Sequence, residues 1–111
     1  MKVVVLSGSP RKNGNTQIMM KHVLEYVNQK DVDAKFINLA DDGFESFKGA
    51  ANEVDYNEKT LQAAKDITEA DVWLVGVPVY NSMFSAALKN IFEFVSYKAT
   101  EGKTAGLTIV A

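Results

Sequence analysis

Apolar and polar positions alternate in blocks along the chain and predict strands and helices in turn. Unbroken apolar runs are typical of parallel strands that are buried on both faces. Between these runs, apolar residues recur at the three-to-four-residue spacing of an amphipathic helix. The resulting order β-α-β-α-β-α-β indicates a parallel sheet with right-handed crossovers and helices on both faces. The predicted strands are 2–7, 34–39, 71–77 and 103–110, and the predicted helices are 15–28, 57–69 and 84–97.

Local signals set some of these boundaries. Asp55 and Glu58 have the spacing of a capping box, which predicts a helix start near residue 57. Pro78 should end the strand before it, because proline cannot donate to a sheet ladder. Residues 40–55 are polar, acidic and long for a connection in an α/β protein, which indicates a functional or partly mobile loop. Its Phe44 and Phe47 either anchor the loop on the core or contact a partner subunit.

The last predicted strand runs to the end of the sequence, and no helix follows to cover it. An apolar strand at the edge of a sheet exposes an unpaired ladder and invites association. We therefore expect residues 1–111 to be one domain that is incomplete at its C-terminal side, or one whose sheet a partner chain completes.

The composition of the chain argues against several classes of function. The chain has 111 residues, 47% of them hydrophobic, which is enough for a folded core. A net charge of −2 gives no basic field for nucleic acid or anionic lipid, so we expect neither as a partner. The chain has no cysteine, hence no disulfide, thiolate metal site or cysteine nucleophile. No signal peptide or spanning run is present, and we expect a cytoplasmic protein.

The turn after the first strand has the features of an anion site. Residues 7–16 read SGSPRKNGNT, between an apolar strand and a predicted helix. Backbone N–H groups and the positive end of the helix dipole meet at such a turn and favour negative charge. Short polar side chains add donors, and an arginine adds a planar fork suited to phosphate. The candidate phosphate ligands are Ser9, Arg11, Asn15 and Thr16.

Other phosphate-binding turns do not match. A Walker A loop needs Gly-Lys-Ser/Thr at its end, and the dinucleotide fingerprint needs G-x-G-x-x-G; neither occurs in residues 7–16. A low-molecular-weight phosphatase needs a cysteine here, and a receiver domain needs an aspartate after the third strand. One plain alternative stays open, in which the turn only connects a strand to a helix and Asn15 or Thr16 caps that helix.

The turn after the third strand is the second candidate. In an open parallel sheet, ligands bind beyond the carboxyl ends of the strands, where the strand order reverses. Pro78 makes this turn rigid, and backbone groups and the aromatic Tyr80 follow it. A phosphate at the first turn and a flat heterocycle at the second describe FMN, although Tyr80 could also be a packing residue with its hydroxyl in water. The candidate ring-binding residues are Pro78, Val79, Tyr80, Asn81 and Ser82.

These motifs resemble those of the flavodoxin-like NADPH-dependent FMN reductase family. The matching segments are GSPRKNGNT at 8–16, PVYN at 78–81 and ALKN at 87–90, in order and spacing along the chain. The resemblance implies a flavodoxin-like three-layer α/β fold with strand order 2-1-3-4 and the family's fifth strand missing. It also implies that the first turn holds the FMN phosphate and that the second lines the isoalloxazine ring. Family members with an iron–sulfur cluster carry cysteines after the second strand, and this chain has none.

The function that the resemblance implies is hydride transfer from NAD(P)H through FMN to a second acceptor, such as free flavin, a quinone or an azo compound. We assign no catalytic acid or base and no metal site. A homodimer or higher homo-oligomer is expected, since relatives commonly place the flavin near a subunit interface. Two other functions stay open: a flavodoxin-like electron carrier, and a cofactor-free fragment that needs a longer chain or a partner.

Overall fold

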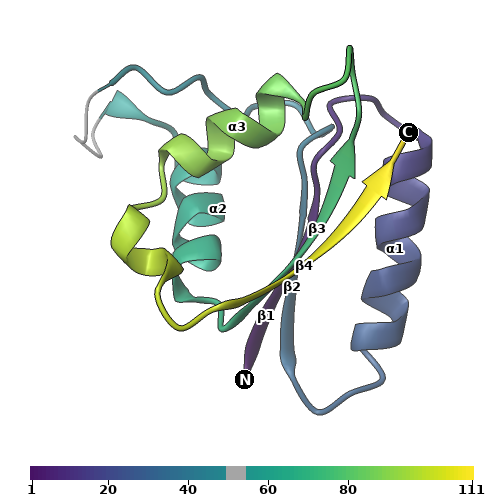
Figure 1. The fold of residues 1–111 in the computed structure, drawn as a ribbon. Helices are drawn as coiled ribbons and strands as arrows, with labels where there is room; N and C mark the ends of the chain where they lie inside the picture. Colours follow the sequence, from purple (N-terminus) through teal and green to yellow (C-terminus); the bar gives the residue numbers. More distant parts are fainter. Residues whose placement is uncertain (50–54) are drawn as a thin grey trace.

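The computed structural model describes residues 1–49 and 55–111, and their strands all point in the same direction (Figure 1). Helices alternate with the strands in the order that the hydrophobic pattern predicts. A 3-10 helix, η2, follows the third helix. The elements are β1 (Lys2–Ser7), α1 (Asn15–Val27), β2 (Asp33–Asn38), α2 (Glu58–Glu69), β3 (Val72–Pro78), α3 (Ala86–Glu93), η2 (Tyr97–Thr100) and β4 (Thr104–Val110).

The sheet has the order β2-β1-β3-β4, and all three neighbouring pairs are parallel. β1 lies between β2 and β3, so the order reverses at β1, and the turns after β1 and β3 flank the reversal. The predicted order 2-1-3-4 and the flavodoxin-like arrangement are therefore confirmed.

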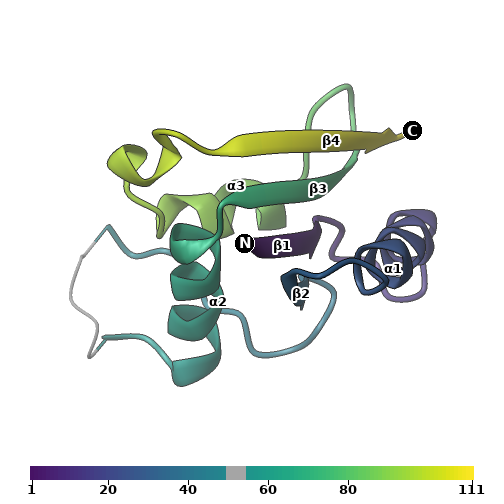
Figure 2. The same cartoon turned by 90° about the horizontal axis from the view of Figure 1, so that it is seen from below.

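The sheet forms the middle of three layers (Figure 2). Helix α1 covers one face, where Met20 and Val27 pack on Val3 and Val5 of β1. Side chains alternate between the faces of a strand, so the neighbouring Val4 and Leu6 point to the opposite layer. Both faces of β1 are thus buried, which explains its unbroken apolar sequence.

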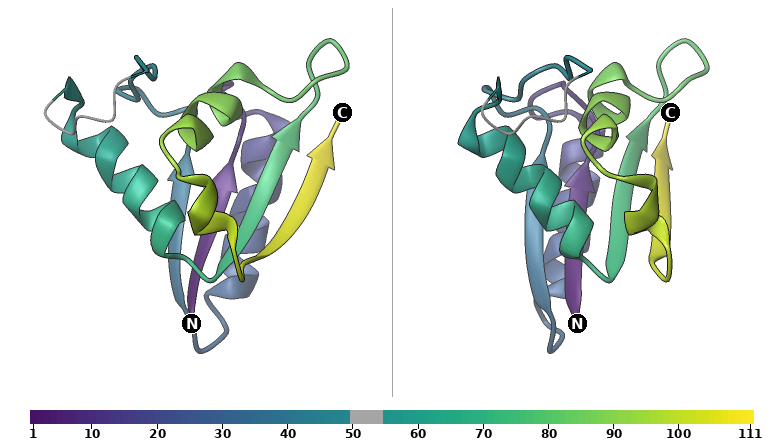
Figure 3. Two further views of the ribbon diagram at one scale, coloured as in Figure 1. Left: turned by 60° about the vertical axis from the view of Figure 1, so that its left-hand side comes forward. Right: turned by 90° about the vertical axis from the view of Figure 1, so that its left-hand side faces the viewer.

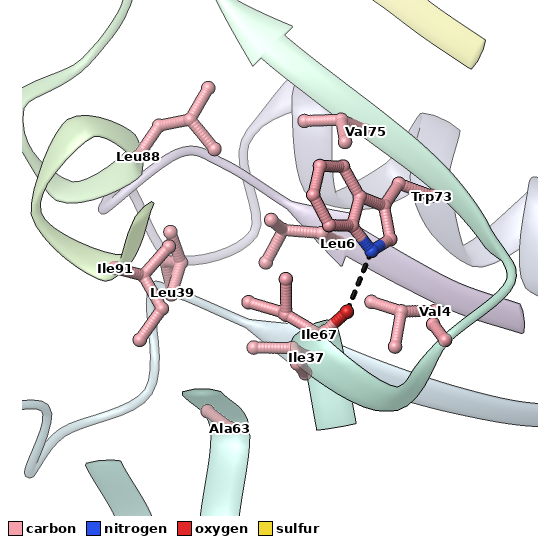
Figure 4. Packing of buried hydrophobic residues seen from close by; sticks show 11 residues of the cluster. Val4, Leu6, Ile37, Leu39, Ala63, Ile67, Trp73, Val75, Leu88 and Ile91 are labelled. Carbon is pink, nitrogen blue, oxygen red and sulfur yellow. Dashed lines mark hydrogen bonds between the residues drawn. The ribbon is translucent and has the colours of Figure 1, made fainter. Parts of the chain in front are cut away.

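Helices α2 and α3 cover the other face and form the larger cluster with the sheet (Figure 4). Ile67 of α2 and Ile91 of α3 are fully buried there. Trp73 of β3 packs in the same cluster, and its indole Nε1 donates a 2.7 Å hydrogen bond to the carbonyl of Ile67. The indole therefore contributes both apolar area and a satisfied polar group, as a core tryptophan requires.

Two local predictions need correction, and the end of β3 shifts by one residue. The third helix ends at Glu93 instead of residue 97, and a separate 3-10 helix follows. Helix α2 is capped by Asn57, whose side chain accepts a 2.9 Å hydrogen bond from the Thr60 N–H, so the predicted Asp55 capping box is wrong. β3 does end at Pro78, as predicted, but Pro78 is itself the last residue of the strand, where its missing N–H costs no further hydrogen bond of the sheet.

The described part of the loop after β2, which runs to residue 49, is anchored on the core. Phe44 packs against the α2/α3 cluster, and the Phe47 ring meets Phe94 edge-on with 5.1 Å between the centroids. Asn90 of α3 binds this loop twice. Its Oδ1 accepts from the Phe47 N–H at 2.8 Å, and its Nδ2 donates to the Glu45 carbonyl at 2.9 Å. Of the predicted loop, residues 50–54 lie outside the described residues.

β4 lies at an edge of the sheet, as Figure 3 shows. Leu107 and Ile109 are 64% and 67% exposed. They lie on the α3 side of the sheet, because Leu107 lines a small pocket with Leu88 of α3 and alternate residues share one face. The expected apolar edge is therefore present. Among the described residues, no helix has both the length and the apolar character needed to cross a bilayer.

Candidate functional site

The two predicted turns lie against each other at the carboxyl end of the sheet (Figure 1). We call residues 8–14 the first turn and residues 79–85 the second turn. Two hydrogen bonds join them: Ser9 Oγ to the Tyr80 hydroxyl at 2.7 Å, and Ser85 Oγ to the Gly8 carbonyl at 2.5 Å. The structure thus brings together segments about seventy residues apart in the sequence.

Gly8 allows the first turn to leave β1 close to β3. Its N–H donates to the Gly76 carbonyl at 3.0 Å. A Cβ on Gly8 would stand only 2.4 Å from that carbonyl oxygen, closer than real contacts allow. Gly76 in turn leaves room for α1, since a Cβ there would meet the Met20 side chain at 2.4 Å. Both glycines therefore set how closely the first turn and α1 approach the sheet.

Helix α1 begins with unpaired backbone donors. Gly14 is its N-cap, and no side chain caps it. Among the described residues, nothing accepts a hydrogen bond from the N–H groups of Asn15, Thr16 and Gln17. The alternative in which Asn15 or Thr16 caps the helix is therefore wrong. Free N–H groups at the positive end of a helix dipole are the elements of an anion site.

The side chain of Gln17 holds the turn in shape. It is buried, and its Oε1 accepts from the Asn13 N–H at 3.0 Å. Asn13 has a φ of 56°, a left-handed conformation that asparagine tolerates better than most residues. Sequence reasoning missed this residue, because only the fold shows that a glutamine in the first helical turn reaches back to the loop.

Arg11 supplies an uncommitted positive charge. Its aliphatic stem runs beside Gly14, 3.3 Å from where a Cβ would stand. No carboxylate or carbonyl of the described residues pairs with its guanidinium. The neighbouring Lys12 differs, since its Nζ forms an exposed 3.2 Å ion pair with Asp42. Of the two cations, Arg11 is the one available to a ligand.

The polar side chains near the turn differ in exposure. Ser9 and Thr16 are buried at 2% and 4% exposure, whereas Asn15 is exposed. Ser9 Oγ accepts from the Arg11 N–H at 3.1 Å, which closes the turn. At the base of the turn, the Ser7 hydroxyl is buried and has no hydrogen-bond partner among the described residues.

The second turn contains a two-residue hairpin. Tyr80 and Met83 exchange two backbone hydrogen bonds, of 2.8 and 2.9 Å. Asn81 and Ser82 between them have φ values of 49° and 68°. Two successive positive φ values are the pattern of a type I′ turn, in which the second position usually favours glycine.

Fewer backbone donors are free in this turn than the sequence indicated. The Val79 N–H donates to the Val110 carbonyl at 3.1 Å, and the Tyr80 N–H is used within the hairpin. Pro78 has no N–H. Within residues 78–82, which the sequence singled out, Asn81 and Ser82 are the two that keep N–H groups without an acceptor among the described residues. The side chains of Val79 and Tyr80 are both partly exposed at the turn.

Ser85 fixes the start of α3 and was not among the predicted site residues. It is buried, and its Oγ accepts from the Leu88 N–H at 3.1 Å while donating to Gly8. A serine three residues before an apolar helical position is a recognisable N-cap signal. The sequence could therefore have indicated the cap, but not its bond to the first turn.

A groove of about 800 Å³ lies beside the first turn, within the size range of small-molecule sites (about 300–1,000 Å³). Its walls come from the first turn, the loop after β2 and α3. In the described part of the chain, no three His, Asp or Glu side chains are grouped to hold a metal ion. The groove is lined by, among others, Pro10, Leu39, Asp41, Phe44, Ala87 and Asn90.

Comparison with known families decides the assignment that the turns suggest. Residues 1–111 match the sequence profile of the NADPH-dependent FMN reductase family. The chain belongs to this family. The resemblance carried by the motifs at 8–16, 78–81 and 87–90 is therefore confirmed.

Individual relatives agree with this membership in the NADPH-dependent FMN reductase family. The chain is 31% identical to an FMN reductase (NADPH) of Escherichia coli over 107 residues, 93% of this chain and 52% of that protein. It is also 31% identical to an iron-sulfur flavoprotein of Methanocaldococcus jannaschii, over 84% of this chain and 51% of the relative. The chain thus spans about half the length of the curated relatives it matches.

A solved structure shows the same fold. The apo form of an NADH:FMN oxidoreductase superposes with a TM-score of 0.75 at 26% identity. The match covers 94% of this chain and 55% of the solved chain. The fold of this chain is therefore shared with a protein of known structure that is named an NADH:FMN oxidoreductase.

Proposed function

We propose that this chain binds FMN and belongs to an enzyme that passes hydride from NAD(P)H, through the flavin, to a second acceptor. The observation that carries the proposal is the set of unpaired donors at the start of α1. Three free N–H groups, a buried hydroxyl and an unpaired guanidinium belong to one turn and the helix start that follows it. Family membership and relatives named as FMN reductases support the same cofactor.

The first turn fits the phosphate end of FMN. The N–H groups of Asn15, Thr16 and Gln17 can donate to phosphate oxygens, and the helix dipole favours the charge. Arg11 offers a bidentate fork, and its pairing with phosphate is charge-assisted. Ser9 and Thr16 add hydroxyl donors. A side chain at Gly8 would collide with the Gly76 carbonyl oxygen and push the first turn out of this shape.

The second turn would meet the flavin ring. The Asn81 and Ser82 N–H groups are free to bond polar ring edges, and the side chains of Val79 and Tyr80 offer apolar and aromatic surface. Pro78 fixes the path of the chain into this turn. We assign no residue of this chain as a proton donor or acceptor, because hydride chemistry needs none to be fixed here.

When bound, FMN would supply the redox chemistry by accepting a hydride and releasing electrons to the acceptor. The protein residues bind and orient the cofactor. The acceptor class proposed is a small molecule such as a free flavin, a quinone or an azo compound. Relatives named as azoreductases support the last of these.

Titration of the purified chain with FMN tests the proposal. Saturable binding, followed by flavin fluorescence and visible absorption, is the expected result. An absence of binding in a chain shown to be folded by circular dichroism would reject it for residues 1–111.

Steady-state oxidation of NADH and NADPH by the FMN-loaded chain then separates two functions. Turnover with free flavin or an azo dye identifies a reductase. FMN binding without nicotinamide oxidation would favour the electron carrier, or indicate that catalysis needs a longer chain. The homo-oligomeric state, the cytoplasmic location and the incomplete domain stay predictions, which size-exclusion mass and fractionation can test.

A further inference from the structure

The hydroxyls of Ser9 and Tyr80 form the one side-chain to side-chain bond between the two turns among the described residues, at 2.7 Å. Ser9 is 2% exposed, whereas Tyr80 is 41% exposed. The tyrosine therefore reaches from the surface hairpin onto a buried atom of the first turn. Its position is restrained, because Tyr80 is also held by both backbone bonds of the hairpin.

Counting protons shows what this pair can offer a ligand. A serine hydroxyl has one proton and two acceptor lone pairs. One lone pair of Ser9 already accepts the Arg11 N–H at 3.1 Å. A phenol is more acidic than an alcohol, so Tyr80 is the better donor and Ser9 the better acceptor of their shared bond. Both lone pairs of Ser9 are then filled, and its own proton has no acceptor among the described residues.

With both lone pairs occupied, the Ser9 hydroxyl can act toward a ligand only as a hydrogen-bond donor. Its remaining proton can only be donated, and it lies in the turn where the free N–H groups of α1 gather. Such a site takes an acceptor with several oxygens and negative charge, which is the chemistry of a phosphate monoester. A carbonyl or a ring nitrogen would not use the neighbouring N–H groups together.

We propose that Tyr80 is a positioning residue for the phosphate group: its hydroxyl orients the Ser9 proton toward the anion and locks the second turn to the first. This inference rests on the proposed function and assigns the tyrosine hydroxyl a role in phosphate binding. The aromatic ring stays available to contact the flavin, so the two roles belong to different parts of one side chain.

Tyr80→Phe tests the hydroxyl while keeping the ring. FMN and riboflavin, which lacks the phosphate, are titrated into both forms. FMN affinity should fall about threefold to tenfold, the effect of one lost hydrogen bond, while riboflavin affinity stays unchanged. Equal losses for the two ligands would assign the hydroxyl to the ring instead, and no loss for FMN would also overturn the inference.

A double-mutant cycle sharpens the test. In a Ser9→Ala background, Tyr80→Phe should cause no further loss of FMN affinity, because the tyrosine acts through the serine. Independent, additive losses of FMN affinity would contradict an action of Tyr80 through Ser9. Tyr97→Phe is the matched control, since Tyr97 is 77% exposed in η2 and away from both turns, and it should change neither affinity.

Inorganic phosphate provides a readout without flavin. Phosphate should raise the melting temperature of the unmodified chain, and the shift should be smaller in Tyr80→Phe. An equal shift in both forms would contradict the inference. If the folded chain binds neither FMN nor phosphate, the proposed function fails together with the inference; if it binds FMN and Tyr80→Phe matches it, the inference alone fails.

Discussion

The two turns share one end of the sheet but use the backbone donors around them differently. In the first turn and the start of α1, the N–H groups of Asn15, Thr16 and Gln17 stay unpaired. In the second turn, the Val79 and Tyr80 N–H groups are consumed by β4 and by the hairpin. The start of α1 thus keeps three successive donors open beside the first turn, whereas the second turn is a hairpin that uses part of its donors internally and presents side chains.

This difference indicates that the two turns contact different parts of a ligand. Open donors beside an unpaired guanidinium suit a compact anion, whatever the rest of the ligand is. A closed hairpin with exposed Val79 and Tyr80 suits surface contact with a flat group and gives it less backbone bonding than the sequence predicted. A ligand that carries both a phosphate and a ring meets the two turns with its two ends.

Breaking the shape of the first turn should have the largest effect. Gly8→Ala places a Cβ 2.4 Å from the Gly76 carbonyl oxygen, so the turn must leave β3 and lose the bond at that carbonyl. We expect a loss of about 3 kcal/mol in the free energy of unfolding, measured by urea denaturation.

Gly14→Ala is the matched control for that substitution. Its Cβ would meet the flexible Arg11 side chain at 3.3 Å, and its φ is negative. The cost should be about 1 kcal/mol or less. Equal costs at the two glycines would show that close approach to the sheet does not set the shape of the first turn.

Loosening the junction of the turns should have an intermediate effect. Ser85→Ala removes the cap of α3 and the bond to the Gly8 carbonyl, leaving that buried acceptor unpaired. The free energy of unfolding should fall by about 1–2 kcal/mol. Ser96→Ala, which removes the exposed cap of η2, should cost less, and the reverse ranking would argue against a joined pair of turns.

Relieving the second turn should give the smallest effect, and a favourable one. Ser82 has a φ of 68°, which glycine adopts without steric cost. Ser82→Gly should raise the free energy of unfolding by up to about 1 kcal/mol in the same urea measurement. Ser82→Ala should give no such gain, and a destabilised glycine variant would mean that the hairpin is not strained.

The hydrophobic pattern predicted the three layers correctly, because the two central strands are apolar as a direct result of their burial. β1 and β3 are covered on both faces, so their runs in the sequence are unbroken. The end of α3 was missed because Phe94 and Val95 continue the apolar spacing. They pack against the same cluster from beyond the helix, so burial without helical structure gives the same pattern.

The site was predictable where its chemistry is local. The first turn carries its donors within one short segment, and α1 begins where that segment ends. The links between the turns depend on tertiary contacts over about seventy residues, which no local pattern encodes. The hairpin was missed because an Asn-Ser pair takes two positive φ values here without the glycine that usually signals them.

The most direct test of the phosphate site compares FMN binding by Arg11→Ala and Lys12→Ala. These adjacent cations differ in that Arg11 is unpaired and Lys12 is paired with Asp42. A lost charge-assisted bond of about 1.5–3 kcal/mol predicts that Arg11→Ala weakens FMN roughly tenfold to a hundredfold, with Lys12→Ala close to the unmodified chain. Unchanged FMN affinity in Arg11→Ala would contradict the assignment of the first turn to the phosphate.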